Sequence, residues 1–298
     1  MQEAAFVGSP GETSRVTRRA AIVGAVAAFA SSYPVLGAGQ HTLRFALTPV
    51  FLTSDLELLD RLRLFLETAT GRTVELVARR TYQEITALLT AGQVDAAWLC
   101  GFPFVQHRTE LDLLAVPIWR GKPLYQSYLI AGTDSAAGGL ADLRGGIHAF
   151  SDPDSNSGYL VTAAGLASMQ ETPDSFFQQT IFTYGHSNVV RAVAAGLAQS
   201  GSVDGYVYEV LKAVNPSLIS STKVLEASHW FGFPPVAAPA SARGSEKSTV
   251  LAQALLTMHD EPTGQDVLEL LRLDRFATEP VSIFDSIEAN MRKVRSLA

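Results

Sequence analysis

Cysteine is almost absent from this sequence of 298 residues, since Cys100 is the only one. A single cysteine cannot form an intramolecular disulfide, and its isolation excludes a cysteine-rich zinc site. The six histidines show no metal-ligand spacing such as His-x₃-His. Cys100 is therefore read in two ways, as a small buried hydrophobe or as a chemically active thiol.

Charge is also scarce, and basic charge is scarcer than acidic charge. Charged residues make up 17% of the chain, with 23 Lys and Arg against 29 Asp and Glu. Beyond residue 39 the balance is 20 against 27, a net charge of −7. This balance argues against nucleic acid and acidic lipid as partners. It does not exclude a small anion, because local hydrogen-bond donors can outweigh a distant net charge.

Long hydrophobic runs are limited to one, Ala20–Ala30, which is too short to span a bilayer. Arg18 and Arg19 precede it and small residues follow at 37–39. The pattern predicts a cleavable export signal over residues 1–39 that resembles a twin-arginine signal, and hence a periplasmic protein. No cysteine lies directly after the run, so no lipid anchor is expected. The alternative is a single N-terminal membrane anchor.

Short strands and helices alternate along the first part of the chain. Strands are predicted at 43–47, 73–78 and 94–99, with helices at 55–70 and 81–91. In the first helix Leu58, Leu62 and Phe65 recur at helical spacing, and Gly71 ends it. The alternation is typical of a parallel sheet with crossover helices, in which ligands bind beyond the carboxyl ends of the strands.

A second alternating set follows, and it predicts two lobes. Further strands are expected at 113–119, 126–131, 147–150, 180–184, 203–207 and 223–227, and helices at 158–170, 187–197, 208–214, 249–258, 264–272 and 283–294. The small polar stretch 132–139 and the aromatic, proline-rich stretch 229–235 are interpreted as two hinge crossings, with 235–238 rejoining the first sheet. We therefore expect an α/β fold with lobe 1 at 40–131 plus 232–298 and an inserted lobe 2 at 132–231, closing around a ligand by hinge motion.

The polar loop after the strand at 147–150 is the first candidate site. Ser155 is a good helix N-cap, and the helix is expected to open at about Gly158. The amides of Asn156, Ser157 and Gly158 would then be unpaired donors at the positive end of a helix. Such a turn holds an oxyanion without any Arg or Lys. The alternative is an ordinary capped strand-to-helix turn.

Other candidate residues also follow predicted strands. Thr48 and Cys100 do so in lobe 1, and His186, Asp204 and Tyr208 in lobe 2. His186 or Ser187 is expected to cap its helix. The amides that follow Cys100 are expected to favour its thiolate. Their common position predicts one cleft between the lobes.

The sequence resembles the PhnD-like family of periplasmic solute-binding proteins, which serve phosphonate, phosphite and related oxyanions. The resemblance lies in three segments, Ser-Asp-Pro-x-Ser-x-Ser-Gly-Tyr at 151–159, Tyr-x-His at 184–186 and Val-Asp-Gly at 203–205. It implies a type II two-lobed binding protein without catalysis or cofactor. By that resemblance Ser155, Ser157 and neighbouring amides through Tyr159 hold the oxyanion, with His186 and Asp204 beside it. Asp204 or Glu209 would meet a cationic group of the ligand.

Cys100 departs from that pattern and opens an alternative. It resembles the arsenite-binding sensors of the AioX type, in which a cleft cysteine captures As(III) and the loaded protein signals to a membrane sensor histidine kinase. Arsenite through Cys100 is the leading hypothesis, and an ABC-transporter component for phosphite, phosphate or phosphonate is the alternative. In both cases we expect a monomer that binds no nucleic acid. A third reading is a periplasmic enzyme with Cys100 as nucleophile and His186 as base.

Overall fold

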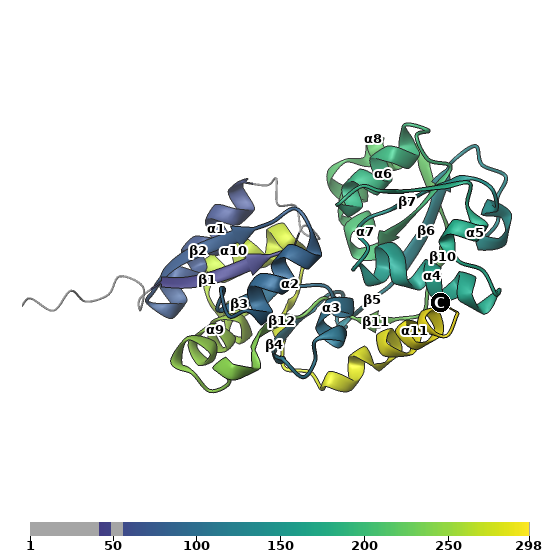
Figure 1. Ribbon diagram of the computed structural model, residues 1–298. Coiled ribbons are helices and arrows are strands. Elements are labelled where there is room, and N and C mark those ends of the chain that lie inside the picture. Colours follow the sequence, from purple (N-terminus) through teal and green to yellow (C-terminus); the bar gives the residue numbers. More distant parts are fainter. Residues whose placement is uncertain (1–41, 49–55, 298) are drawn as a thin grey trace, which may run out of the picture. The chain divides into compact units, whose positions relative to one another are not determined.

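The computed structural model describes residues 42–48 and 56–297 (Figure 1). The expected export signal at 1–39 lies outside the described residues. Within the described part, no helix has the length and apolar character needed to cross a membrane.

The first lobe is built on a mixed sheet of six strands. These are β1 (Thr42–Leu47), β2 (Thr73–Ala78), β3 (Ala96–Trp98), β4 (Leu111–Ile118), β12 (Val236–Pro239) and β13 (Arg275–Ala277). Their order is β13-β4-β12-β3-β1-β2. The strand β1 pairs in parallel with β2 and β3, so the carboxyl ends of these three strands meet at one edge. The predicted rejoining segment is confirmed, because β12 pairs antiparallel with β3 and β4.

Helices connect the strands of this lobe. They are α1 (Leu56–Thr70), α2 (Tyr82–Thr90), α3 (Gly101–Gln106), η3 (Ala240–Ala242), α9 (Glu246–Leu256), η4 (Met258–Asp260) and α10 (Pro262–Leu271). The apolar stripe predicted for the first helix is buried, as Leu58, Leu62, Phe65 and Leu66 show. Because α2 and α3 follow β2 and β3, both helices start at the same sheet edge.

The second lobe has a five-stranded sheet. Its strands are β6 (Ser127–Gly132), β7 (Ile147–Phe150), β8 (Gln179–Phe182), β9 (Ser200–Asp204) and β10 (Thr222–Ala227). They lie in the order β10-β6-β9-β7-β8, and β7 pairs in parallel with β8 and β9. Its helices are η1 (Leu140–Leu143), η2 (Asn156–Leu160), α4 (Val161–Ser168), α5 (Pro173–Phe176), α6 (His186–Ala194), α7 (Gly205–Val214) and α8 (Pro216–Ile219). The strand expected at 203–207 is wrong in its second half, because Asp204 caps α7 and the chain turns helical at Gly205.

Two crossings join the lobes, and the first lies earlier in the chain than the expected segment 132–139. The short strands β5 (Leu124–Tyr125) and β11 (Phe231–Gly232) pair antiparallel with each other outside both sheets. The return crossing expected at 229–235 contains β11. The first crossing is not at 132–139, because β6 already pairs with β9 and β10 in the second sheet. The glycines and polar residues of 132–139 instead form a surface connection within lobe 2.

The C-terminal segment does not pack on lobe 1 alone, in contrast to the predicted boundary. It forms η5 (Val281–Phe284) and α11 (Asp285–Arg295). Helix α11 packs against α3 of the first lobe and against η2 and α4 of the second (Figure 1). A Cβ at Gly101 would lie 2.6 Å from Ile287 Cδ1, so a glycine at the start of α3 permits this close approach. The helix thus bridges the two lobes.

Candidate functional site

The polar loop between β7 and α4 forms the second-lobe side of the site. Ser155 is the N-cap, as predicted, and its Oγ accepts the Gly158 N–H at 3.0 Å. The helix begins at Asn156, two residues earlier than expected, and its first turn is a π-helix. A Cβ at Gly158 would lie 1.8 Å from Ser151 Oγ and 3.0 Å from His186 Cε1. Only glycine at this position lets the helix approach both neighbours.

Three buried side-chain oxygens in this loop have no hydrogen-bond partner among the described residues. They are Ser151 Oγ, Asn156 Oδ1 and Ser157 Oγ. All three residues are at most 1% exposed. Leaving a buried polar atom unpaired costs about 1–3 kcal/mol, so three such atoms together indicate a place built to bind something polar.

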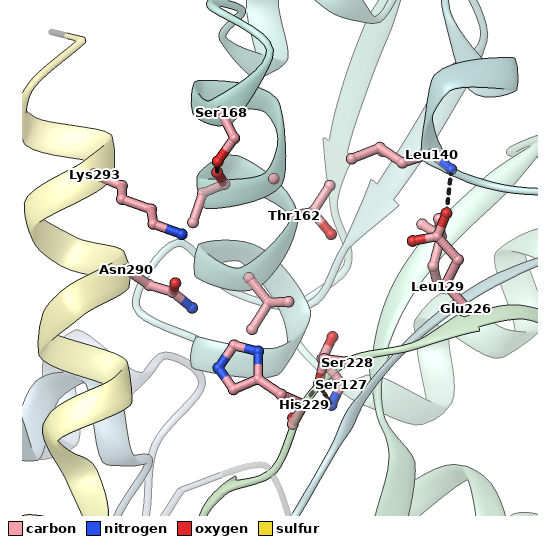
Figure 2. Close-up of a pocket in the computed structure, with 13 residues that line it drawn as sticks. Ser127, Leu129, Leu140, Thr162, Ser168, Glu226, Ser228, His229, Asn290 and Lys293 are labelled. Carbon is pink, nitrogen blue, oxygen red and sulfur yellow. Dashed lines mark hydrogen bonds between the residues drawn. The ribbon is translucent and has the colours of Figure 1, made fainter.

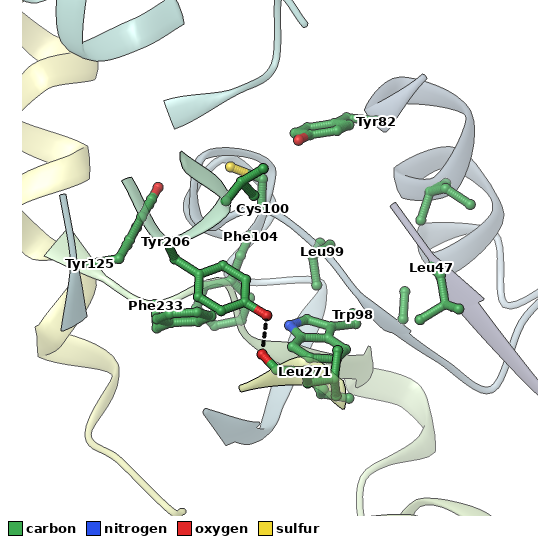
Figure 3. Packing of buried hydrophobic residues seen from close by; sticks show 14 of the residues in the cluster. Leu47, Tyr82, Trp98, Leu99, Cys100, Phe104, Tyr125, Tyr206, Phe233 and Leu271 are labelled. Atoms are coloured by element: carbon green, nitrogen blue, oxygen red, sulfur yellow. Dashed lines mark hydrogen bonds between the residues drawn. The ribbon is translucent and has the colours of Figure 1, made fainter. Parts of the chain in front are cut away.

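Residues of lobe 1 meet this loop directly. The Asn156 N–H donates to Cys100 Sγ at 3.3 Å, and the Tyr82 N–H donates to Asp152 Oδ2 at 3.1 Å. Asn156 Nδ2 donates to Tyr125 Oη, on the crossing strand β5, at 2.9 Å. Figure 3 shows Cys100 between Tyr82 and Tyr125. The ends of α2, α3 and β5 therefore form the opposite wall of the site.

The first-turn amides are less free than predicted. Asn156 N–H is used by Cys100, and Gly158 N–H is used by the Ser155 cap. Ser157, as the second helical residue, has no acceptor within the helix by its position. The expectation of three free amides is thus wrong for two of them, because the sulfur and the cap oxygen already occupy them.

A chain of hydrogen bonds fixes the protonation of His186. The Asp204 N–H donates to His186 Nδ1 at 3.0 Å, so Nδ1 is the unprotonated nitrogen. Burial lowers the pKa of His186 to about 3, which keeps the ring neutral. Its proton is then on Nε2, which donates to Tyr82 Oη at 3.3 Å. The hydroxyl proton of Tyr82 is left to donate elsewhere.

The hydroxyl proton of Tyr125 is also left to donate, since its oxygen already accepts from Asn156 Nδ2. Burial raises the pKa of Tyr82 and of Tyr125 well above the ordinary value, so both phenols keep their protons. Together with Ser151 and Ser157, they give the site four hydroxyl donors. Such neutral donors stabilise an oxyanion without a cation.

Burial also changes the pKa values of the two other candidate ionisable groups. Burial raises the pKa of Cys100 to about 12, so the group is a thiol. The thiolate expectation is wrong because removal from water outweighs the amides that donate to the sulfur. Burial also raises the pKa of Asp204 to about 7, and Oδ1 of this residue accepts the Val207 N–H at 3.2 Å as the cap of α7.

The arrangement does not form the catalytic pair that the enzyme reading requires. Both nitrogens of His186 are engaged, by Asp204 N–H and by Tyr82, and Cys100 Sγ accepts from Asn156. A protonated thiol and a histidine that is neutral with both nitrogens occupied do not make a nucleophile and its base. Within the described residues, no group of three or more His, Cys, Asp or Glu side chains could hold a metal ion.

Comparison with known proteins identifies the family. Residues 45–279 match a family model described as "ABC transporter, phosphonate, periplasmic substrate-binding protein". The chain belongs to this phosphonate-binding family of periplasmic proteins. The membership confirms the PhnD-like resemblance, whereas nothing in the comparisons shows the arsenite-binding branch.

Individual relatives support the same fold. A binding protein component of an ABC phosphonate transporter from Pseudomonas aeruginosa matches with a TM-score of 0.78 and 20% identity, over 86% of this chain and 89% of that one. PhnD1 from Prochlorococcus marinus, solved with methylphosphonate, matches with a TM-score of 0.75 and 17% identity, over 86% and 98%. These matches confirm the two-lobed α/β fold.

A curated relative is closer in sequence but matches over less of its length. The phosphate-import protein PhnD of Mycolicibacterium smegmatis is 34% identical over 174 residues, which are 54% of this chain and 54% of that protein. This chain therefore spans about half the length of the curated relative it matches. The relatives are binding proteins of transporters rather than enzymes.

The structure does not bring every predicted residue of this family member to the site. Thr48 lies at the carboxyl end of β1, where its Oγ1 donates to Trp98 O at 3.2 Å. Tyr208 is directed elsewhere, because its hydroxyl bonds Thr222 Oγ1 at 3.0 Å. Tyr159 packs on Phe150, with ring centroids 5.1 Å apart. The side chains of Tyr159 and Tyr208 thus stabilise lobe 2.

Two further predictions fail at the helix ends. Glu209 pairs with Arg120 at 3.2 Å, so its carboxylate is not directed to the site. The N-cap of α6 is Gly185, which makes no side-chain cap, rather than Ser187 or His186. His186 is instead buried as the first residue of that helix, which places its ring against Tyr82 and Asp204.

Tyr82 and Tyr125 were missed by the sequence analysis. Tyr82 follows β2 and the Thr81 cap of α2, so its position after a strand is a signal that the sequence contains. Tyr125 lies in a two-residue strand, for which the sequence has no periodic signal.

Residues of α4 and α11 contribute to the lining of a cavity of about 240 Å³ (Figure 2). Its lining includes Thr162, His229, Asn290 and Lys293. None of the residues described above as forming the site lines this cavity.

Proposed function

We propose that this protein is the substrate-binding component of an ABC transporter and that it binds a phosphorus oxyanion, namely phosphate, phosphite or a phosphonate. The observation that carries the proposal is the group of three unpartnered oxygens, Ser151 Oγ, Asn156 Oδ1 and Ser157 Oγ. Tyr82, Cys100 and Tyr125 hydrogen-bond the same loop from the opposite side. Membership of the phosphonate-binding family, with relatives named for phosphate import and for phosphonate transport, supports the ligand class and the permease partner.

The donors suit an anion of this size. Four hydroxyls, from Ser151, Ser157, Tyr82 and Tyr125, can each donate to a ligand oxygen, and Ser157 adds a backbone N–H. The residues described as forming the site include no Lys or Arg. Electrostatic stabilisation then comes from neutral dipoles in a place removed from water, where each hydrogen bond is stronger than in solvent.

Arsenite is the second candidate, and it depends on Cys100. The sulfur accepts the Asn156 N–H at 3.3 Å, in the turn that carries two of the unpartnered oxygens. Against it, the group is a thiol with a pKa of about 12, and As(III) favours thiolates. We therefore place the phosphorus oxyanions first, and with them the permease rather than the sensor kinase.

A thermal-shift screen tests the ligand class. The purified protein is heated with phosphate, phosphite, methylphosphonate, 2-aminoethylphosphonate or arsenite. A ligand at about 100 times its Kd stabilises the folded state by about 2.7 kcal/mol, which raises Tm clearly. We expect a rise with at least one phosphorus compound. If only arsenite raises Tm and Cys100→Ser loses that rise, the second candidate replaces the first.

A further inference from the structure

The three unpartnered oxygens are not equivalent. Ser151 and Ser157 carry hydroxyls, which can donate or accept. Asn156 Oδ1 is a carbonyl oxygen and can only accept. Its orientation is set by the neighbouring Nδ2, which donates to Tyr125 Oη at 2.9 Å. Among the described residues it is thus the one unpartnered, buried side-chain atom that needs a donor from outside the protein.

Other acceptors near the site are already satisfied. Asp152 accepts Asp154 N–H at 2.9 Å on Oδ1 and Tyr82 N–H at 3.1 Å on Oδ2. Cys100 Sγ accepts from Asn156 N–H, and His186 Nδ1 accepts from Asp204 N–H. The requirement for a donor is therefore concentrated at Asn156 Oδ1.

We propose that the site selects an oxyanion carrying a proton on one oxygen, such as hydrogen phosphate or a hydrogen phosphonate, over an oxyanion carrying none, such as sulfate. This inference rests on the proposed function. The P–OH group donates to Asn156 Oδ1, while the remaining oxygens accept from the serine and tyrosine hydroxyls. Sulfate offers acceptors only, so it leaves the Asn156 carbonyl buried and unpaired. A site that hydrogen-bonds a ligand O–H discriminates strongly against an analogue lacking it.

Calorimetric titrations at about pH 6 test the inference, with phosphate, methylphosphonate and sulfate as probes. At this pH both phosphorus anions carry a proton and sulfate does not. For the wild-type protein we expect phosphate or methylphosphonate to bind about 10- to 100-fold more tightly than sulfate. Sulfate binding as tightly as both would overturn the inference and leave the proposed function standing.

Two variants assign the selectivity to a residue. Asn156→Ala removes the acceptor but keeps the backbone N–H, and we expect the affinity ratio to fall to about threefold or less. Ser157→Ala is the matched control on the same turn, because it removes a donor that both anions use. It should weaken both and leave the ratio unchanged. An unchanged ratio in Asn156→Ala contradicts the role of Asn156.

The wild-type titration decides the question even where a variant does not fold. If neither phosphate nor methylphosphonate binds and the thermal screen shows no phosphorus ligand, the proposed function fails. If they bind without discrimination against sulfate, only the selectivity fails. The two failures are therefore distinguishable from the same set of measurements.

Discussion

The two walls of the site differ in what they have already paired. On the second-lobe wall, Ser151, Asn156 and Ser157 keep oxygens without partners. On the opposite wall, Tyr82, Cys100 and Tyr125 all contact the second lobe already. The second lobe therefore supplies the unpartnered oxygens available to a ligand. The first lobe and the crossing strand β5 hold these groups in place and add the hydroxyl donors of two tyrosines.

The two buried histidines make the comparison sharper. His148 and His186 are both buried, and burial lowers the pKa of each to about 3. His148 lies within lobe 2, between Ser200 Oγ at 2.7 Å and Ser202 Oγ at 2.9 Å. His186 bonds across to Tyr82. One therefore stabilises a core, and the other connects the two walls.

The largest effect on binding is expected from Gly158→Ala. The new Cβ would lie 1.8 Å from Ser151 Oγ and 2.7 Å from Ser151 Cβ, so the loop must move away from its helix. We expect phosphate affinity, measured by calorimetry, to fall about 100-fold. Gly165→Ala on the same helix is the control, because its Cβ meets only the flexible Leu140 Cδ2 at 3.0 Å. Equal affinities for the two variants would contradict the close-packed turn.

An intermediate effect is expected from His186→Gln. The change removes the fixed donor to Tyr82, and we expect phosphate affinity to fall about 10-fold. His148→Gln removes hydrogen bonds of the same kind within the core, so it should lower Tm and leave affinity within about twofold. Loss of binding in His148→Gln without unfolding would show that the two histidines do not differ in this way.

The lowered pKa values of His148 and His186 predict how the free energy of unfolding depends on pH. The folded state holds both neutral down to about pH 3, whereas the unfolded chain protonates them below about 6.5. Each therefore lowers the free energy of unfolding by about 1.4 kcal/mol per pH unit as pH falls through that range. Asp204 acts oppositely, since its folded pKa of about 7 keeps a proton that the unfolded chain releases above about pH 4.

Between about pH 4 and 6.5, His148, His186 and Asp204 together give the free energy of unfolding a net slope of about 1.4 kcal/mol per pH unit. The joint contribution of these three groups to stability should thus decline as pH falls from 6.5. His148→Gln removes one histidine and should flatten the slope. Urea unfolding at about pH 6.5, 5.5 and 4.5 measures it, and an equal slope in wild type and variant would contradict the buried neutral state of His148.

The smallest effect is expected from Tyr208→Phe. Because its hydroxyl bonds Thr222, the variant should bind phosphate within about twofold of the wild type. Tyr82→Phe, which removes a donor from the site, should bind phosphate at least about 10-fold more weakly. If the two variants behave in the reverse order, the hydroxyl of Tyr208 reaches the ligand and the placement of the site is wrong.

Much of this arrangement could be predicted from the sequence because it depends on local patterns. The cap at Ser155 and the position of Cys100 after a strand follow from residue type and periodicity. The buried stripe of α1 does as well. The positions of Cys100 and Asn156 after strands also predicted that they lie together, and the Asn156 N–H donates to Cys100 Sγ.

The predictions that were wrong concern properties set by the tertiary environment. Nothing in the sequence around Cys100 shows that burial will hold the thiol protonated, or that its sulfur will take the Asn156 amide. The side chains of Tyr159 and Tyr208 are not directed to the site, because Tyr159 packs on Phe150 and the Tyr208 hydroxyl hydrogen-bonds Thr222, both within lobe 2. The crossing strand with Tyr125 is only two residues long, and its pairing with β11 is set by residues a hundred positions away.

The measurement that tests the central claim most directly is calorimetric titration of the Ser151→Ala/Ser157→Ala double variant with phosphate and methylphosphonate, beside the wild type. Both residues are buried, and neither hydroxyl oxygen has a partner among the described residues. Removing them should not unfold the protein but should weaken the binding of both anions by about 100-fold. A double variant that keeps its Tm and binds both anions as tightly as the wild type would contradict the account.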